Sequence, residues 1–186
     1  TVFEGDPLAV LDPTEADVAA VDAEAEIDLD RIRPDLAELF ERKALLQDEA
    51  RPEAVAKRRK LSKRTARENV AQLTDEGSFL EYGDLIHAAQ TYRRTKEDLI
   101  RNTPADGLVA GLGTINGELF GPEASRAAVL AYDYTVLAGT QGIMNHEKKD
   151  RMVDVIARQR LPMVFFCEGG GGRPGAVGAP GRFRSE

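Results

Sequence analysis

The sequence has little that could cross-link it or hold it in a membrane. Cys167 is its single cysteine in 186 residues, which excludes an internal disulfide and a four-cysteine zinc ribbon and favours a reducing, cytoplasmic setting. No apolar run approaches the roughly twenty residues that a membrane-spanning helix requires. Glu4 and Asp6 stand where a secretory signal would carry basic residues. Thr1 in place of an initiator Met is what we expect of a fragment, a processed chain or a trimmed one.

Histidine is nearly as scarce, since only His87 and His146 are present. His146 is followed by Glu147, but no second histidine stands four residues further on, so the metalloprotease motif is missing and we expect no metal. A position on a helix surface is the better interpretation for His146, unless the glycine loop before it turns the ring toward a ligand. The residues identify no convincing nucleophile and no convincing general base.

The acidic balance also limits the choice of partner. Acidic residues outnumber basic ones by 32 to 25, and the net charge of −7 argues against a general nucleic-acid binder or a binder of anionic membranes. The basic residues nevertheless gather in one stretch. Such a stretch is most often the solvated face of a helix, although Arg and Lys also suit the phosphates of a small molecule. Its members are Lys57, Arg58, Arg59, Lys60, Lys63, Arg64 and Arg67.

The first part of the chain changes character twice. Residues 1–11 place two short apolar runs around a Glu-Gly-Asp-Pro turn, which predicts a hairpin whose remaining sheet lies elsewhere. Residues 12–33 are acidic and rich in alanine, and because such a segment repels itself and buries little, we expect a linker. From Pro34 the spacing of apolar residues predicts helices as far as Leu73, with a stop at Arg51-Pro52.

A capping box is the clearest helix signal in this region. Thr65 and Glu68 have the required spacing, and Ser62 marks a break before them. Val70 and Leu73 supply the buried face. We therefore expect a separate helix to begin after Thr65.

Strand and helix signals alternate in the second half. Glycines punctuate residues 108–116, which predicts two short strands joined by a tight turn. Residues 127–137 are typical of a buried strand, residues 145–160 of a helix, and residues 162–167 of another buried strand. A strand, a helix and a parallel strand with glycines at its carboxyl end indicate an α/β fold.

Two glycine loops follow the buried strands. The run Gly169 to Gly172 lets the backbone approach a ligand and present N–H groups to it, so it could form an oxyanion hole, a phosphate cradle or a flexible loop. It is not a Walker A loop, because no Gly-Lys-Ser or Gly-Lys-Thr follows. The second loop covers residues 138–142. Loops at the carboxyl ends of successive parallel strands lie at one edge of a sheet, and we therefore expect a shared site.

Several segments, taken in order, have the spacing of one known family. They are residues 60–70 with Leu73 and residues 75–79, residues 106–113, and residues 132–142 with Lys148 beyond. Over about residues 57–175 the sequence resembles the carboxyltransferase domain of biotin-dependent acyl-CoA carboxylases. The glycine run stands where that family has its first oxyanion loop.

The resemblance implies a fold and a reaction. The fold is α/β and crotonase-like, built from ββα units, and residues 34–175 would form an incomplete amino-terminal half with a helical segment at its start. The reaction passes a carboxyl group from carboxybiotin to the α-carbon of an acyl-CoA. Backbone amides stabilise the enolate of the thioester, and biotin accepts the proton.

The resemblance also implies roles for single residues. Gly170 and Gly171 would supply the enolate-stabilising amides, with Gly169 and Gly172 as alternatives one residue away. Two further groups would contact the acyl-CoA. Near its thioester arm we expect Gly139, Thr140, Gln141 and Gly142; for its phosphates we expect Lys63, Arg64 and Arg67.

The partners follow from the same resemblance. Residues 1–11 are similar to the last strands of a biotinyl carrier domain, so biotin would be carried on another domain. We expect biotin carboxylase and biotinyl carrier domains, the remaining carboxyltransferase half and further copies of the chain as partners, and neither nucleic acid nor a membrane. Residues 176–186 do not resemble what should follow the glycine run, and we expect a disordered or out-of-frame tail. This chain alone is therefore expected to be inactive.

Two other functions stay open. A crotonase-type enoyl-CoA hydratase or isomerase would share the fold and would need a carboxylate base near the oxyanion loop, for which Glu168 is the only nearby candidate. An inactive CoA-binding fragment is the non-enzyme alternative. The sequence does not identify the acyl group.

Overall fold

The computed structural model describes residue 28 and residues 30–173. The chain divides into two units, Thr1–Arg33 and Pro34–Glu186, and the helices and strands described below belong to the second. The expected hairpin of residues 1–11, most of the expected linker of residues 12–33 and the tail of residues 176–186 lie outside the described residues.

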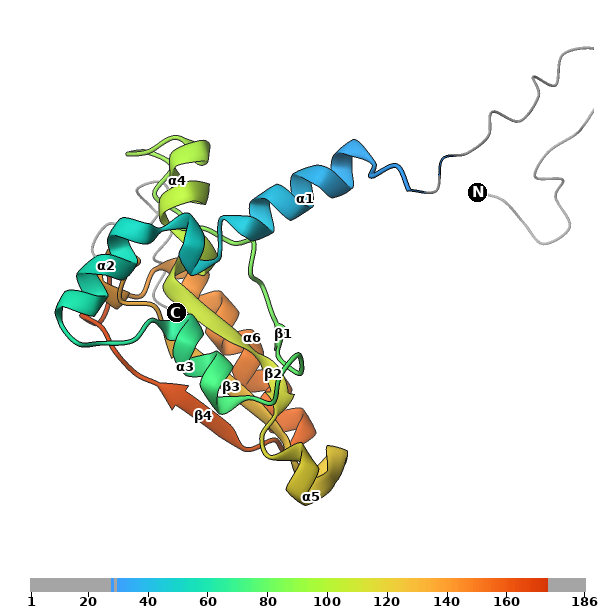
Figure 1. Ribbon diagram of the computed structural model, residues 1–186. Coiled ribbons are helices and arrows are strands. Elements are labelled where there is room, and N and C mark those ends of the chain that lie inside the picture. Colours follow the sequence, from blue (N-terminus) through green and yellow to red (C-terminus); the bar gives the residue numbers. More distant parts are fainter. Residues whose placement is uncertain (1–27, 29, 174–186) are drawn as a thin grey trace, which may run out of the picture. The chain divides into compact units, whose positions relative to one another are not determined.

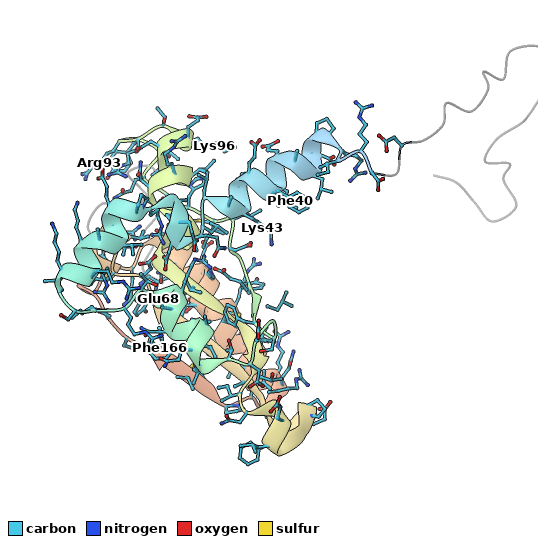
Figure 2. All side chains as sticks on the ribbon, viewed as in Figure 1. Phe40, Lys43, Glu68, Arg93, Lys96 and Phe166 are labelled. Carbon is cyan, nitrogen blue, oxygen red and sulfur yellow. The ribbon has the colours of Figure 1, made fainter. Side chains whose placement is uncertain are left out.

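The second unit begins with helices, as the apolar spacing predicts. They are α1 (Pro34–Ala44), a short 3-10 turn (Asp48–Ala50), α2 (Pro52–Lys60) and α3 (Ala66–Leu73). Pro52 begins α2, because proline suits the first turn of a helix and cannot continue the preceding one. The capping box is confirmed: the Glu68 N–H donates to Thr65 Oγ1 at 3.1 Å, and the Thr65 N–H donates to Glu68 Oε2 at 2.9 Å (Glu68 is labelled in Figure 2).

A four-stranded sheet with the order β1-β2-β3-β4 forms the centre of the unit. Neighbours β1 and β2, and β2 and β3, are antiparallel, whereas β3 and β4 are parallel, as expected. The strands are β1 (Leu80–Glu81), β2 (Leu108–Thr114), β3 (Arg126–Tyr132) and β4 (Met163–Phe166); the helices between them are α4 (Lys96–Asn102), α5 (Gly117–Ala124) and α6 (Ile143–Gln159).

Helices cover both faces of this sheet (Figure 1). On one face, alternate residues of β2 and β3, among them Leu108 and Leu130, pack against Met152 of α6. On the other face, the intervening residues pack against Val70 of α3, and Phe166 of β4 joins this cluster (labelled in Figure 2). Both faces of the central strands are therefore buried, which explains their continuous apolar sequence.

One lysine ties α6 to the sheet. Lys148 is buried, and its Nζ donates a hydrogen bond to the backbone oxygen of Leu108 in β2. Desolvation lowers the pKa of Lys148 to about 8, while the negative charges of Glu81, Asp84 and Asp106 oppose this shift and the positive charge of Arg67 adds to it.

The prediction of two short strands within residues 108–116 is wrong. Residues Leu108–Thr114 form the single strand β2. Gly111 does not turn the chain; it leaves room for β1, since a Cβ there would lie 2.2 Å from the backbone oxygen of Leu80. A strand glycine can thus mark close backbone approach as well as a turn.

The strand predicted for residues 127–137 is shorter than expected. It ends at Tyr132, because the carboxylate of Asp133 accepts hydrogen bonds from the backbone N–H and the hydroxyl of Thr135 and bends the chain out of the sheet. The helices α4 and α5 were not predicted from the sequence. Among the described residues, no helix is both long enough and apolar enough to cross a membrane.

Candidate functional site

The two glycine loops lie side by side, as the parallel strands require. The Gln141 N–H donates to the Gly171 oxygen at 2.8 Å, and the Arg173 N–H donates to the Gln141 oxygen at 2.8 Å. Gly139 and Gly169 also lie close together, since a Cβ on Gly169 would lie 2.2 Å from the Gly139 oxygen. The expectation that both loops share one edge of the sheet is confirmed.

The backbone N–H groups of Gly170 and Gly171 have no hydrogen-bond acceptor among the described residues. Both residues are exposed. The Gly171 oxygen, in contrast, is engaged by Gln141. Unpaired backbone N–H groups at the carboxyl end of a strand can stabilise negative charge on an oxygen atom.

A carboxylate held by two cations precedes the glycine run. Glu168 accepts from Arg58 through both oxygens, at 3.0 and 2.6 Å, and from Lys63 Nζ at 3.0 Å. The hydrogen bonds from Arg58, and then those from Lys63, lower the pKa of Glu168 to about 2. Glu168 is therefore ionised near neutral pH and is a weak base.

Arg58 is the centre of this cluster. It is buried although it belongs to the basic stretch of the sequence. Its Nε and Nη2 also donate to the Arg64 oxygen, at 3.2 and 2.8 Å, and its guanidinium lies 5.3 Å from the ring centre of Tyr134. Arg58 thus joins α2, the segment before α3, the end of β4 and the loop after β3.

A second ion pair, more deeply buried than the first, follows the glycine run. Arg173 donates to the carboxylate of Asp106, and the two side chains are 4% and 0% exposed. The same guanidinium binds Thr140 twice, through Nε to Oγ1 at 3.2 Å and through Nη2 to the backbone oxygen at 2.6 Å. Gly142 lies beneath it, and a Cβ there would meet Arg173 Nη1 at 2.6 Å.

The remaining predicted site residues have other partners. Gln141 Oε1 accepts from Lys149 Nζ at 3.1 Å. Arg64 is exposed and donates to the Glu68 oxygen at 2.9 Å. Arg67 donates to the Leu46 oxygen at 2.6 Å and forms a two-pronged ion pair with Glu81. The structure thus brings Lys63 to the glycine run, whereas the guanidinium of Arg67 is occupied elsewhere.

A hollow of about 510 Å³ opens beside the Arg58 cluster. It lies between α2, the end of α4 and the loop after β3, and its mainly apolar wall includes four basic side chains. Lining residues include Arg51, Lys57, Arg58, Leu61, Arg101 and Tyr134.

Comparison with known proteins decides the family. The family model described as the carboxyl transferase domain matches residues 57–180. This chain belongs to the carboxyl transferase family. The resemblance stated from the sequence is therefore confirmed, and the carboxyltransferase assignment agrees with the curated relatives.

Those relatives are carboxylase subunits. The chain is 34% identical over 139 residues to the propionyl-CoA carboxylase beta chain of Saccharopolyspora erythraea, an alignment that covers 74% of this chain and 23% of that protein. It is 36% identical over 138 residues to the biotin-dependent long chain acyl-coenzyme A carboxylase beta4 subunit of Mycobacterium tuberculosis, covering 74% and 24%. The chain thus spans about a quarter of the length of the curated relatives it matches.

Solved structures support the same fold. A single-chain, multi-domain long-chain acyl-CoA carboxylase superposes with a TM-score of 0.76 at 61% identity, over 82% of this chain and 15% of that chain. The transcarboxylase 12S hexamer with methylmalonyl-CoA bound superposes with a TM-score of 0.58 at 29% identity, over 75% of this chain and 25% of that chain. The crotonase-like carboxyltransferase fold is confirmed.

The two ion pairs beside the glycine run were not predicted from the sequence. In the sequence Arg58 is one member of a basic stretch, but its side chain pairs with Glu168, which lies 110 positions later. Asp106 lay within a matched segment and Arg173 directly followed the glycine run, but their pairing across 67 positions left no local signal. The one available hint was the presence of opposite charges, Glu168 and Arg173, at the two ends of the run.

Proposed function

We propose that this chain forms the acyl-CoA side of a carboxyltransferase site in a biotin-dependent acyl-CoA carboxylase. One observation carries the proposal: the exposed N–H groups of Gly170 and Gly171 have no acceptor among the described residues and lie against the loop of residues 139–142. This arrangement suits a thioester whose oxygen gains negative charge during the reaction.

The residues of the chain would act by binding and by charge stabilisation. The amides of Gly170 and Gly171 donate to the thioester oxygen and lower the energy of the enolate. Residues 139–142 line the thioester arm. Carboxybiotin, carried on another domain, would supply the carboxyl group and take up the α-proton. No side chain of the chain then needs to act as the base, in agreement with the low pKa of Glu168.

We place the phosphates of the acyl-CoA against a basic surface of the chain. Lys63 and Arg64 are exposed, and Lys63 binds Glu168 immediately before the glycine run. Arg58 lines a hollow together with Lys57 and Arg101. Arg and Lys suit phosphate. Arg67 stays in the proposal only as a support, because its guanidinium is bound to Glu81.

Two alternatives make different predictions. An enoyl-CoA hydratase needs a base with a pKa near the working pH, and Glu168, with a pKa of about 2, does not meet this need. An inactive CoA-binding fragment would bind acyl-CoA and never contribute to carboxyl transfer.

The partners in the proposal are the biotin carboxylase and biotinyl carrier domains, the remaining carboxyltransferase half and further copies of the chain.

A segment exchange tests the proposal. Residues 57–173 replace the equivalent segment of the single-chain long-chain acyl-CoA carboxylase that is 61% identical, and labelled bicarbonate is followed into acyl-CoA. Enoyl-CoA hydration is measured in parallel, with Glu168→Gln as the matched variant. We expect carboxyl transfer and no hydration. Normal carboxylation of biotin without transfer to acyl-CoA would contradict the proposal, and hydration lost in Glu168→Gln would establish the hydratase instead.

A further inference from the structure

The glycine run is fastened at both ends by an ion pair. Glu168 stands immediately before Gly169, and Arg173 stands immediately after Gly172. Each of the two binds a charged side chain from a distant part of the sequence, Arg58 in the first case and Asp106 in the second. The four glycines between them contribute no side chain of their own to hold the backbone.

The first fastening ties the run to the helical segment. Arg58 is buried on α2 and meets both oxygens of Glu168 in a two-pronged geometry, which fixes direction as well as distance. Lys63 binds the same carboxylate from the segment that leads into α3. Arg58 also donates two hydrogen bonds to the Arg64 backbone oxygen. The same guanidinium therefore links Glu168 to the backbone before α3.

The second fastening ties the run to the neighbouring loop and to α6. Arg173 bridges Asp106 and Thr140. Asp106 is itself held by Asn145 in the first turn of α6, through the Asn145 N–H at 2.9 Å and through Nδ2 to the Asp106 backbone oxygen at 3.0 Å. The guanidinium of Arg173 therefore contacts two segments directly, at Asp106 and Thr140, and is linked to α6 through Asp106.

We propose that Glu168 and Arg173 are positioning residues: their ion pairs with Arg58 and Asp106 set the direction in which the Gly170 and Gly171 N–H groups point. The inference rests on the proposed function, because it assigns a purpose to those two amides. Glycine has the widest conformational freedom of all residues, so four in succession would otherwise sample many backbone directions. Stabilisation of an oxyanion requires donors that are already oriented before the charge develops.

Two ligands distinguish orientation of the Gly170 and Gly171 N–H groups from simple binding of acyl-CoA. Propionyl-CoA reports binding of the ground state. A coenzyme A nitronate, whose planar anionic nitro group imitates the thioester enolate, reports stabilisation of the charge. Calorimetry on the 186-residue chain measures both affinities, and we expect the chain to bind the nitronate at least about tenfold more tightly than propionyl-CoA.

The variants act on one fastening at a time. Glu168→Gln removes the charge at nearly constant volume, and Arg173→Met removes the second pair. Arg173→Lys keeps the charge but cannot reach Asp106 and Thr140 together, so its effect should be intermediate. We expect Glu168→Gln and Arg173→Met to reduce the nitronate preference about tenfold while the propionyl-CoA affinity changes less than about threefold.

Glu123→Gln on α5, whose side chain is 90% exposed, is the matched control and should retain the preference. Thermal unfolding followed by circular dichroism confirms that each variant is folded, and Glu168→Gln and Arg173→Lys provide the test should Arg173→Met not fold. Retention of the full preference by folded Glu168→Gln and Arg173→Lys would overturn the inference alone. Absence of any preference in the unaltered chain would overturn the proposed function and the inference with it.

Discussion

The carboxylate of Glu168 binds the guanidinium of Arg58 through both of its oxygens, at 3.0 and 2.6 Å. This pair links a helix before the sheet to the residue immediately before the glycine run. It also keeps Glu168 ionised, since the pKa falls to about 2. A carboxylate in this state can hold a loop in place but cannot accept a proton efficiently near neutral pH.

The first prediction concerns stability and pH. The pKa of Glu168 is lower in the folded chain than its ordinary value of 4.5, so its ion pairs stabilise the fold above about pH 5 and lose this effect as the pH falls toward 2. Glu168→Gln should therefore lower the free energy of unfolding by about 1–3 kcal/mol at neutral pH, and the difference should shrink in acid. Urea unfolding at several pH values measures it.

The exposed Glu123→Gln serves as control for this series and should show no such pH dependence. A difference between Glu168→Gln and the unaltered chain that stayed constant from pH 7 to about pH 3 would mean that the charge of Glu168 does not stabilise the fold.

The second prediction concerns the contact between the two glycine loops. Gly169 has a positive φ, and a Cβ there would overlap the Gly139 backbone oxygen at 2.2 Å. Gly169→Ala must therefore push the loops apart and should cost about 1–3 kcal/mol of stability. Gly172→Ala is the matched comparison, since a Cβ there meets nothing within 4 Å, and it should cost less than about 0.5 kcal/mol. Equal thermal stability of the two variants would refute the close approach.

The third prediction concerns Lys148. Its pKa is about 8 when folded and ordinarily 10.5, so the unfolded chain binds more protons between these values and stability from this group rises with pH there. Relative to Lys148→Met, which keeps the buried methylenes but cannot titrate, the unaltered chain should gain roughly 2–3 kcal/mol between pH 8 and about 10.5. Guanidinium unfolding at each pH gives the comparison, and parallel curves for the two proteins would show that Lys148 is not desolvated.

Local patterns predicted much of the fold. The Thr65 and Glu68 capping box and the helix before β4 could be recognised because each depends on residues close together in the sequence. The parallel pairing of β3 with β4 followed from the order of strand, helix and strand. Gly111 shows the limit: whether a strand glycine turns the chain or admits a neighbour depends on β1, which lies about thirty positions earlier.

The site was predictable to a similar extent. The glycine loops of residues 138–142 and 169–172 were recognisable from their places after apolar strands. The ion pairs of Arg58 and Asp106 were not, since a charged residue on a helix or in a turn is ordinarily solvated, and only the folded chain shows that both side chains are buried. Of the basic stretch, the sequence could not separate the buried Arg58 from its exposed neighbours.

The most direct test of the central claim is the infrared carbonyl frequency of an acyl-CoA labelled with ¹³C at the thioester carbonyl and bound to this chain. Donation from the Gly170 and Gly171 amides polarises the bond, so the account predicts a shift to lower frequency than in free acyl-CoA, and loss of that shift in Gly169→Ala. A labelled thioester that binds the chain with its carbonyl frequency unchanged would contradict the claim that these amides stabilise the enolate.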